Sequence, residues 1–372
     1  FTGDFHAISA ANNLLAAMLD NHIKQGNDLN IDPMNIVWKR VVDMNDRQLR
    51  NVIDGIAGAS SGTINGVTRP DGFDITVASE VMAVFCLATN LADLKDRLGK
   101  MIVAYSFDNQ PITCADLKAT GALTALLKDA IKPNLVQTLE QTPAIIHGGP
   151  FANIAHGCNS VIATKLALNL ISKKSVGNPG YVITETGFGA DLGAEKFIDI
   201  KCRAASIAPS CVVIVATIRA LKHHGGAKKD ELNIENLESL EKGLPNLLQH
   251  GSNIKEIFNI EPIVALNKFP TDTDAEVQFA KEKCNELGVN LILSDVWANG
   301  GNGGTELAEA VIKTTKDKQV NLKYTYPLES SVEEKPNSIA KNIYHADNVV
   351  LSAPARKKLL QIEQQGFANW PI

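Results

Sequence analysis

Beyond residue 100, apolar runs of strand length alternate with segments of helical period, and turns rich in Gly, Asn or Asp separate them. The runs predict strands over residues 101–107, 144–147, 181–185, 211–217, 263–267 and 290–294. Helices are expected over residues 153–173, from the turn at 187–189 through Lys201, over 274–287 and over 305–316. The strand residues are nearly all apolar, which suits strands covered on both faces, as in βαβ units. The pattern therefore predicts an α/β fold with mostly parallel, doubly wound sheets.

The first hundred residues have a different pattern, in which helical periods dominate. Long helices are expected over residues 8–25 and 77–98, whereas residues 33–65 combine short helices with a loop rich in Gly, Ser and Asn. Residues 319–337 are polar and interrupted by proline, which makes them the best linker candidate. The acidic and hydroxyl side chains of residues 272–274 are typical of a helix N-terminus, where they cap free N–H groups.

Composition and charge narrow the class of protein. The 372 residues are 45% hydrophobic and 21% charged, as in ordinary globular proteins, so intrinsic disorder is not expected. The formal net charge of −5 argues against a nucleic-acid partner, which normally meets a basic face. No apolar stretch is long enough to span a bilayer and no secretory signal is visible, so no membrane partner is expected. The six cysteines form no C-x-x-C pair, which favours free thiols in a reducing cytoplasm over a zinc site or a disulfide framework.

The loop from His147 to Gly157 follows one predicted strand and opens a predicted helix. In a parallel sheet, ligands bind beyond the carboxyl ends of the strands. The paired Gly148 and Gly149 allow close approach of the backbone to a ligand, and the N–H groups of a helix N-terminus favour an anion. The alternative is an ordinary tight turn in which His156 is an interior residue with its hydrogen bonds satisfied.

A second glycine-rich loop, Thr184 to Gly193, carries the pattern G-x-G-x-x-x-G. This spacing is close to the dinucleotide-binding fingerprint G-x-G-x-x-G but does not equal it. The acidic residue that binds a ribose is expected about 20 residues further on, but Pro209 stands there with no acid close by. A nicotinamide cofactor is therefore disfavoured, while a phosphate or nucleotide contact stays open.

Two later loops carry aromatic residues directly after predicted strands. Asn267 and Lys268 imitate the Asn-Lys-x-Asp loop with which GTPases bind guanine, but Pro270 stands where that Asp is required. Phe269 and Pro270 could instead form a flat apolar wall for a ring, unless Phe269 is part of the core. Trp297, in a glycine-rich loop with few expected core partners, is a second candidate for ring stacking. The chain contains no G-x-x-x-x-G-K-[ST] phosphate-binding loop.

Six segments together resemble the formate–tetrahydrofolate ligase family, in family order over nearly the whole chain. They are FTGDFHAI at 1–8, DGFDITVASE at 71–80, GPFANIAHG at 149–157, and the segments 184–193, 265–272 and 297–304. The resemblance implies a P-loop-NTPase-like large domain with additional Rossmann-like α/β domains. It also implies an enzyme that uses ATP with Mg²⁺ to join formate to tetrahydrofolate through formyl phosphate, and a homo-oligomer, usually a tetramer.

The resemblance further implies roles for individual residues. The pterin ring of the folate is expected between Phe269, Pro270 and Trp297. The nucleotide and acyl-phosphate walls are expected at Gly148, Gly149, His156, Asn159, Glu185, Gly187, Gly189 and Asp191. His6 resembles an active-site histidine that could act as general base for the N10 proton, and Asp4 is a catalytic candidate that could help hold a monovalent cation, K⁺ or NH₄⁺.

The resemblance also sets expectations for domains and activity. Residues 1–240 are expected to form the central part of the large nucleotide-binding domain, 241–325 an α/β domain with the folate-stacking loops, and 326–372 a C-terminal α/β portion. In the family the phosphate-binding loop lies upstream of the segment that starts at Phe1, so these 372 residues alone are expected not to catalyse ATP-dependent formylation, unlike the intact protein. Two alternatives are a truncated, non-catalytic paralogue that keeps the fold and folate binding, and a GTPase-like protein, which Pro270 argues against.

Overall fold

The chain divides into two compact units, an N-terminal unit of Phe1–Phe188 and a C-terminal unit of Gly189–Ile372. The computed structural model describes residues 3–56, 66–149, 154–174, 180–286, 288–316 and 319–372. Both units combine helices with small sheets, so the predicted α/β class is confirmed. The predicted domain limits at residues 240 and 325 stay predictions.

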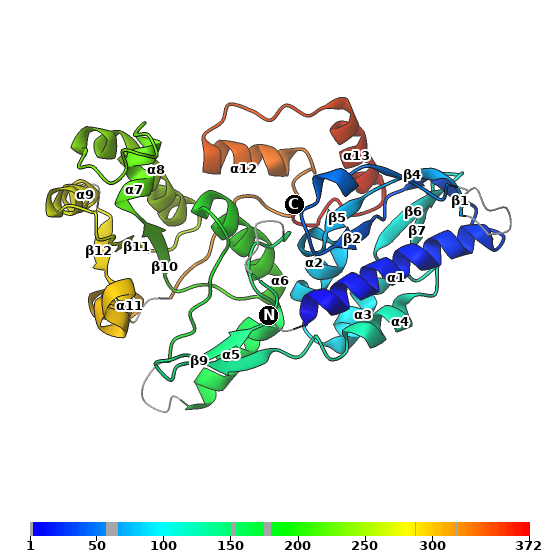
Figure 1. Ribbon diagram of the computed structural model, residues 1–372, viewed down its shortest axis with the longest axis horizontal. Coiled ribbons are helices and arrows are strands. Elements are labelled where there is room, and N and C mark those ends of the chain that lie inside the picture. The colour runs from blue at the N-terminus through cyan, green and yellow to red at the C-terminus, as the bar shows by residue number, and fades with distance from the viewer. Residues whose placement is uncertain (1–2, 57–65, 150–153, 175–179, 287, 317–318) are drawn as a thin grey trace. The chain divides into compact units, whose positions relative to one another are not determined.

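The N-terminal unit is built from short strands and helices around one long helix, α1 (Figure 1). Its helices are α1 (Asp4–Lys24), α2 (Glu80–Leu87), α3 (Leu91–Gly99), α4 (Thr120–Leu127) and α5 (Val161–Lys174), with 3-10 turns η1 (Arg47–Leu49) and η2 (Thr76–Ala78). Its strands are β1 (Ile31–Ile36), β2 (Arg40–Val42), β3 (Val52–Asp54), β4 (Arg69–Asp71), β5 (Phe73–Ile75), β6 (Ile102–Ser106), β7 (Pro111–Thr113), β8 (Asn134–Gln137) and β9 (Pro143–Ile146). The buried side of α1 packs with α2, α3, α4 and β6 in the core.

The predicted strands at 101–107 and 144–147 form as β6 and β9, but their described pairings are antiparallel. β6 lies between β1 and β7, and β9 pairs with β8. The connections from β6 to β7 and from β8 to β9 are only a few residues long, and parallel strands need a crossover of a dozen or more. In this unit β2 and β5 form the parallel pair among the described strands.

Other elements of the N-terminal unit begin or end away from their predicted positions. The helix expected over 77–98 breaks into α2 and α3 because Ala88 is extended and the Asn90 side chain caps a new helix at the N–H of Asp93. Strands β1 to β3 occupy part of the region 33–65 where short helices were expected. The helix expected from residue 153 begins at Val161. Residues 181–185 form no strand, and Thr186 makes only an isolated bridge to Cys158.

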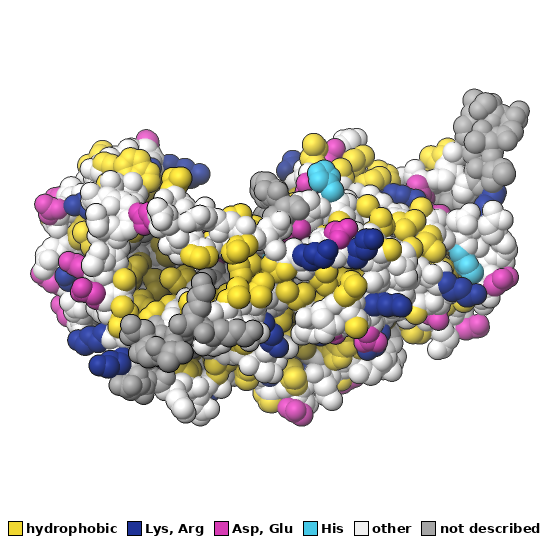
Figure 2. Space-filling model, turned by 90° about the horizontal axis from the view of Figure 1, so that it is seen from below, with side chains coloured by type: hydrophobic (Ala, Val, Ile, Leu, Met, Phe, Trp, Pro, Cys, Tyr) yellow, Lys and Arg dark blue, Asp and Glu magenta, His cyan; other side chains and the backbone are white. Residues whose placement is uncertain are grey.

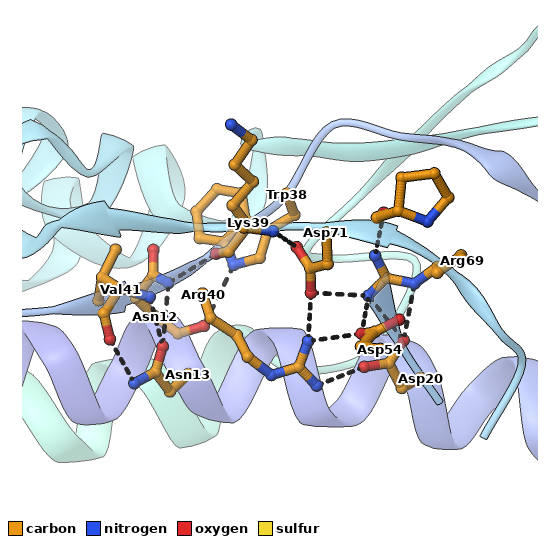
Figure 3. Close-up of polar contacts among 12 residues, drawn as sticks. Asn12, Asn13, Asp20, Trp38, Lys39, Arg40, Val41, Asp54, Arg69 and Asp71 are labelled. Carbon is orange, nitrogen blue, oxygen red and sulfur yellow. Dashed lines mark hydrogen bonds and ion pairs between the residues drawn. The ribbon is translucent and has the colours of Figure 1, made fainter. Parts of the chain in front are cut away.

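The strand β2 is fixed to α1 by amide hydrogen bonds (Figure 3). Asn13 donates to the Val41 carbonyl and accepts from the Val41 N–H, at 3.0 and 2.9 Å. The buried Trp38 donates its indole N–H to the carbonyl of Asn12 at 3.1 Å, and Asn12 donates to the carbonyl of Lys39. The side chains of α1 thus hydrogen-bond to the backbone in and next to β2, as a second neighbouring strand would.

Two arginines and three aspartates extend this attachment to β3 and β4 (Figure 3). Arg40 contacts Asp20 at 2.6 Å, Asp54 at 3.2 Å and Asp71 at 2.5 Å. The buried Arg69 contacts the same three carboxylates at 3.0 to 3.3 Å. Burial raises the pKa of Asp54, helped by its Asp71 and Asp20 neighbours and opposed by Arg69. We call these five residues the Arg–Asp network.

The C-terminal unit contains a three-stranded parallel sheet in the order β10-β11-β12, formed by β10 (Val212–Ala216), β11 (Pro262–Asn267) and β12 (Asn290–Ser294) (Figure 1). Its helices are α6 (Arg203–Ala205), α7 (Ile218–His224), α8 (Leu237–Ser252), α9 (Asp274–Glu286), α10 (Val296–Asn299), α11 (Thr305–Thr315), α12 (Glu334–Tyr344) and α13 (Ala353–Gln364). The π-helical segments η3 (Ala190–Ala194), η4 (Phe197–Cys202) and η5 (Asn253–Ile257) and the 3-10 segment η6 (Gly300–Gly304) complete it. α8 packs against β10 and β11, and α9 and α11 pack against β12.

Sequence patterns locate this unit's elements well. The three strands match the predicted runs to within one residue at each end, and α9 and α11 match the helices expected over 274–287 and 305–316. The segment expected to be helical through Lys201 is helical, but largely in π geometry, which is rare and frequent at functional sites. Within the expected linker 319–337, α12 already begins at Glu334.

Several large apolar side chains are exposed. Figure 2 shows hydrophobic side chains gathered on the face that it draws. In the N-terminal unit, exposed apolar residues of the β8–β9 hairpin include Leu135, Leu139 and Ile146. No helix in the described part of the chain is long and apolar enough to cross a bilayer. All six cysteines lie in described segments, where they are free thiols.

Candidate functional site

The glycine loop of the N-terminal unit is closed at its base by two contacts between His147 and Ser160. The Ser160 N–H donates to the His147 carbonyl at 3.2 Å, and the Ser160 hydroxyl lies 2.6 Å from Nδ1 of the His147 ring. The Ser160 hydroxyl also accepts from the N–H of Ala163, which caps the start of α5. Residues 150–153 of this loop, expected to help bind the nucleotide, lie outside the described residues.

Asp4 lies beside the first glycine of this loop. It is buried in the first turn of α1, and its Oδ2 accepts the Gly148 N–H at 3.3 Å. Within the described residues, Asp4 Oδ1 is buried and has no hydrogen-bond partner. An orphaned, buried carboxylate oxygen is a suitable ligand for a monovalent cation, because such cations prefer oxygen donors. Asp4 Oδ1 is therefore available as one oxygen ligand for the cation that the resemblance implies.

Gly148 requires glycine for two reasons. Its φ is +60°, in the left-handed region that glycine adopts most readily. A Cβ atom at this position would also lie 2.6 Å from Cys86 Sγ, well inside van der Waals contact. The glycine pattern seen in the sequence is thus explained by the backbone conformation and packing at Gly148.

The first glycine loop meets the beginning of the second one within the N-terminal unit. The Gly187 N–H donates to the Gly157 carbonyl at 2.8 Å, next to the bridge between Cys158 and Thr186. His156 is fully buried, and Asn159 accepts a hydrogen bond from the Thr164 hydroxyl. The loops therefore place Gly157, Cys158 and the Thr186–Gly187 turn side by side.

The other predicted residues near these loops differ in exposure. Glu185 and His6 are exposed, and His6 lies in the first helical turn, two residues after Asp4. Gly149 is buried. Gly189 and Asp191 belong to the C-terminal unit, where the Tyr344 hydroxyl donates to the Asp191 carbonyl. The structure thus brings Asp4 and Gly148 into contact within one unit.

In the C-terminal unit, Phe269 and Trp297 follow neighbouring parallel strands at the same edge of the sheet. Asn267, the last residue of β11, is in register with Ser294, the last residue of β12, and the Lys268 N–H donates to the Ser294 carbonyl at 3.0 Å. Phe269 is 39% exposed and Trp297 is 82% exposed. Both rings, and the exposed Pro270 that follows Phe269, are therefore open to a ligand at the carboxyl edge.

The turn after Phe269 is held by Asp272. The Asp272 carboxylate accepts the Phe269 N–H at 2.8 Å, and the Asp272 N–H donates to the Phe269 carbonyl at 3.0 Å. The Arg219 guanidinium lies 5.6 Å from the centre of the Phe269 ring, within cation–π range. Phe269 is therefore fixed at its backbone while part of its ring stays exposed.

A buried ion pair anchors the base of this turn. Thr273 and Glu276 form a capping box at the start of α9: each side chain accepts the backbone N–H of the other, at 3.2 Å. Glu276 also contacts the Lys222 ammonium at 2.7 Å and accepts the Asn236 N–H. Burial would raise the pKa of Glu276, but the hydrogen bonds from Lys222, Asn236 and Thr273 outweigh it, and the pKa is lowered. Glu276 is therefore held as a carboxylate.

The Trp297 loop is closed by a close approach between two backbone segments. The Asp295 N–H donates to the Gly303 carbonyl at 3.0 Å, and a Cβ atom at Gly303 would lie 2.2 Å from the Asp295 carbonyl oxygen. Only glycine allows this approach of backbone to backbone. The loop thus presents a ring that packs little against its own unit and is open to stacking on a ligand.

A buried acid pair lies in the π-helical segment that follows the second glycine loop. Burial, followed by the adjacent Asp199 carboxylate, raises the pKa of Glu195 to about 8. Asp199 is fully buried and accepts from Arg203 at 3.1 Å and from the Thr325 N–H at 3.0 Å. Glu195 is therefore protonated at neutral pH.

Sequence reasoning missed the residues that hold the loops: His147 and Ser160, and Lys222 and Glu276. Thr273 and Glu276 have the T-x-x-E spacing of a capping box, so their mutual hydrogen bonds could have been predicted from the sequence. His147 stood in the quoted loop but offered no signal of a partner 13 residues away. Among the described residues, no three His, Cys, Asp or Glu side chains converge as a metal site.

Comparison with known protein families identifies the chain as a whole. The family model described as formate–tetrahydrofolate ligase matches residues 1–372. The match covers both units, including the loops at Gly148, Phe269 and Trp297. The chain therefore belongs to the formate–tetrahydrofolate ligase family.

Proposed function

We propose that the intact protein is an active ligase that joins formate to tetrahydrofolate with ATP and yields 10-formyltetrahydrofolate by way of formyl phosphate. The observation that carries the proposal is the family match over the whole chain. It is supported by the two aromatic rings expected to hold the pterin, which are exposed beyond neighbouring strand ends. A pterin is a flat ring, and stacking between apolar faces is how proteins commonly hold such rings. Phe269, Pro270 and Trp297 are its proposed contacts.

The reaction has two steps in this proposal. A formate oxygen attacks the γ-phosphorus of ATP, ADP leaves, and formyl phosphate forms. The N10 lone pair of tetrahydrofolate then attacks the formyl carbon, the carbon–oxygen bond to phosphate breaks, and phosphate departs with the electron pair. The N10 proton passes to a base, for which we propose His6, because it is exposed beside Asp4.

The acyl phosphate is proposed to face the glycine loops. Backbone N–H groups that point at developing negative charge stabilise it. Gly149 and Gly189 are the proposed donors, while Gly148 and Gly187, whose N–H groups bond to Asp4 and to the Gly157 carbonyl, shape the loops. His156, Asn159, Glu185 and Asp191 complete the proposed nucleotide and acyl-phosphate contacts. Asp4 Oδ1 is the proposed ligand for K⁺ or NH₄⁺, which would place positive charge near the phosphate. Mg²⁺ is expected to accompany ATP.

Folate binding gives the sharpest test. Titration of tetrahydrofolate should show that Trp297→Ala weakens binding by about 1–3 kcal/mol, the size of aromatic–base stacking. Trp370→Ala is the matched control, because Trp370 is also exposed and lies in the same unit but outside the loops. Equal affinities of the Trp297→Ala and unchanged proteins would remove Trp297 from the site.

Product formation separates the proposal from the main alternative. The full-length protein, supplied with formate, ATP and tetrahydrofolate, should form 10-formyltetrahydrofolate and release ADP. A non-catalytic paralogue would bind tetrahydrofolate with the Trp297 dependence above but form no product. The two measurements thus decide between a ligase and a folate-binding protein.

A homo-oligomer and a cytoplasmic location belong to the same proposal. The apolar side chains exposed at Leu135, Leu139 and Ile146 support an assembly, because large exposed apolar patches commonly mark interfaces. Light scattering of the purified protein measures its mass directly. A monomer at micromolar concentration would contradict the homo-oligomer.

A further inference from the structure

His147 lies at the junction between β9 and the glycine loop, and its ring is completely buried. Its backbone carbonyl and its Nδ1 both contact Ser160, at 3.2 and 2.6 Å. The residue that enters the loop is therefore joined twice to the residue that leaves it. We call this pair the His–Ser clamp.

The hydrogen bonds define the protonation of the ring. Nε2 lies 2.8 Å from the Ala130 carbonyl, which can only accept, so Nε2 carries the hydrogen. In the neutral ring Nδ1 then accepts from the Ser160 hydroxyl, whose oxygen accepts in turn from the Ala163 N–H at 3.0 Å. Burial lowers the pKa of His147, against the Ala130 carbonyl and the Asp4 carboxylate, which agrees with a neutral ring. Every polar atom of the clamp is satisfied.

The clamp controls the position of the next residue. Gly148 follows His147 directly, and its N–H donates to Asp4 Oδ2. The His147 ring also contacts the Phe85 ring, with centroids 4.9 Å apart, and a Cβ at Gly148 would strike Cys86 on the same helix. The ring, the turn and Asp4 are thus linked by direct contacts.

We propose that His147 and Ser160 are positioning residues for formyl transfer, which fix the Gly148–Gly149 turn and Asp4 in the geometry that the acyl-phosphate step requires. The inference rests on the proposed function, because it takes the glycine turn as the acyl-phosphate wall. Neither side chain touches a substrate in this proposal. Loss of the clamp shifts the turn, and misplacement by about 1 Å can reduce a rate about 100-fold.

Two substitutions at His147 separate its two hydrogen bonds. In His147→Asn the amide takes the place of Nδ1, so its oxygen still accepts from Ser160. In His147→Gln the amide takes the place of Nε2, so it still donates to Ala130 but no longer reaches Ser160. Ser160→Ala removes the clamp from the other side. Leu123→Ala, in the buried core of the same unit, is the control for lost stability alone.

Steady-state kinetics of the full-length protein distinguish a positioning role from a structural one. We expect His147→Gln and Ser160→Ala to lower kcat about 10- to 100-fold while KM for tetrahydrofolate changes less than about twofold. His147→Asn should stay within about threefold of the unchanged protein, because it keeps the bond to Ser160. Equal losses in His147→Asn and His147→Gln, or losses no greater than in Leu123→Ala, would overturn the proposal.

Hydrogen exchange tests the clamp independently of turnover. The Gly148 and Ala163 amides should exchange at least about tenfold faster in His147→Gln than in His147→Asn, while amides of β6 are unchanged. Absence of product from the unchanged protein would refute the proposed function. Equal exchange at Gly148 in both variants would refute the clamp, so the two failures are distinguishable.

Discussion

The two candidate loops are fixed at their bases by buried polar pairs of opposite character. In the N-terminal unit a neutral His147–Ser160 pair closes the glycine loop, whereas in the C-terminal unit the ionic Lys222–Glu276 pair supports the Phe269 turn. A neutral pair loses less solvation on burial than an ion pair does, and a buried ion pair is tolerated only when hydrogen bonds satisfy its remaining atoms. Glu276 meets that condition through the N–H groups of Asn236 and Thr273. Buried polar pairs of either kind can thus fix a loop, at different energetic risk.

The largest difference should appear when the ionic pair is broken. Lys222→Met leaves the buried Glu276 carboxylate without its cation, and the free energy of unfolding should fall by about 3–5 kcal/mol. Urea denaturation measures the change. Lys242→Met is the control, because it removes an exposed pair with Glu238 at a similar 2.6 Å, and solvent screening should make its effect on stability small. A double variant, Lys222→Met with Glu276→Leu, should recover most of the loss; no recovery would mean that packing and not charge is decisive.

The glycine loop should be sensitive to volume and backbone conformation. Gly148→Ala should lower the free energy of unfolding by about 2–4 kcal/mol, because alanine is strained at φ +60° and its Cβ would meet Cys86 at 2.6 Å. Gly121→Ala, inside α4 with open space around it, should instead be neutral or stabilise by up to about 1 kcal/mol. If both variants unfold at the same urea concentration, the close packing at Gly148 is wrong.

A third buried pair, Glu195 with Asp199, extends the comparison to two acids. The pKa of Glu195 rises from 4.5 to about 8 in the folded protein, so the folded state binds one more proton between these values. The contribution of Glu195 to the free energy of unfolding should therefore be greatest below pH 4.5. It should fall as the pH rises, by up to about 1.4 kcal/mol per pH unit, and level off above about pH 8. Glu195→Gln should flatten that slope in urea denaturation repeated across pH. An unchanged slope would assign the pH dependence to other groups.

The smallest effect on stability is expected at the exposed ring. Trp297→Ala should change the free energy of unfolding by no more than about 0.5 kcal/mol, because little of the ring is buried. The same substitution is expected to weaken folate binding, so its two effects separate cleanly. A large loss of stability would show that the ring packs within its own unit and is not held open for a ligand.

The parallel sheet was predictable because its strands are uniformly apolar and each is bounded by turn residues. Because Phe269 and Trp297 each follow one of two neighbouring parallel strands, the order of residues along the chain was enough to place them at the same edge of the sheet. The N-terminal unit was less readable, since strands of three residues such as β2 depend on distant partners like Asp71. Pairing direction was missed for β6 and β9, although the short connections beside them carried that information.

The candidate site was also hard to predict wherever a residue depends on a partner distant in sequence. Glycines and aromatic residues in loops can be recognised in a sequence, because few other residue types suit those positions. The buried groups that hold them cannot: Ser160, Lys222 and Arg69 are common residue types whose partners become known only from the fold. Sequence therefore located the surfaces that would meet a ligand and left out most of what fixes them in place.

The Arg–Asp network has a consequence for the order in which the N-terminal unit folds. Strands β2, β3 and β4 have three residues each, too few to persist by themselves in water. They gather around Arg40 and Arg69, and both guanidiniums also contact Asp20 on α1, which lies 49 positions before Arg69. Contacts between residues so far apart in sequence form late in folding. We therefore expect the three strands to become ordered only once α1 presents Asp20 to both arginines.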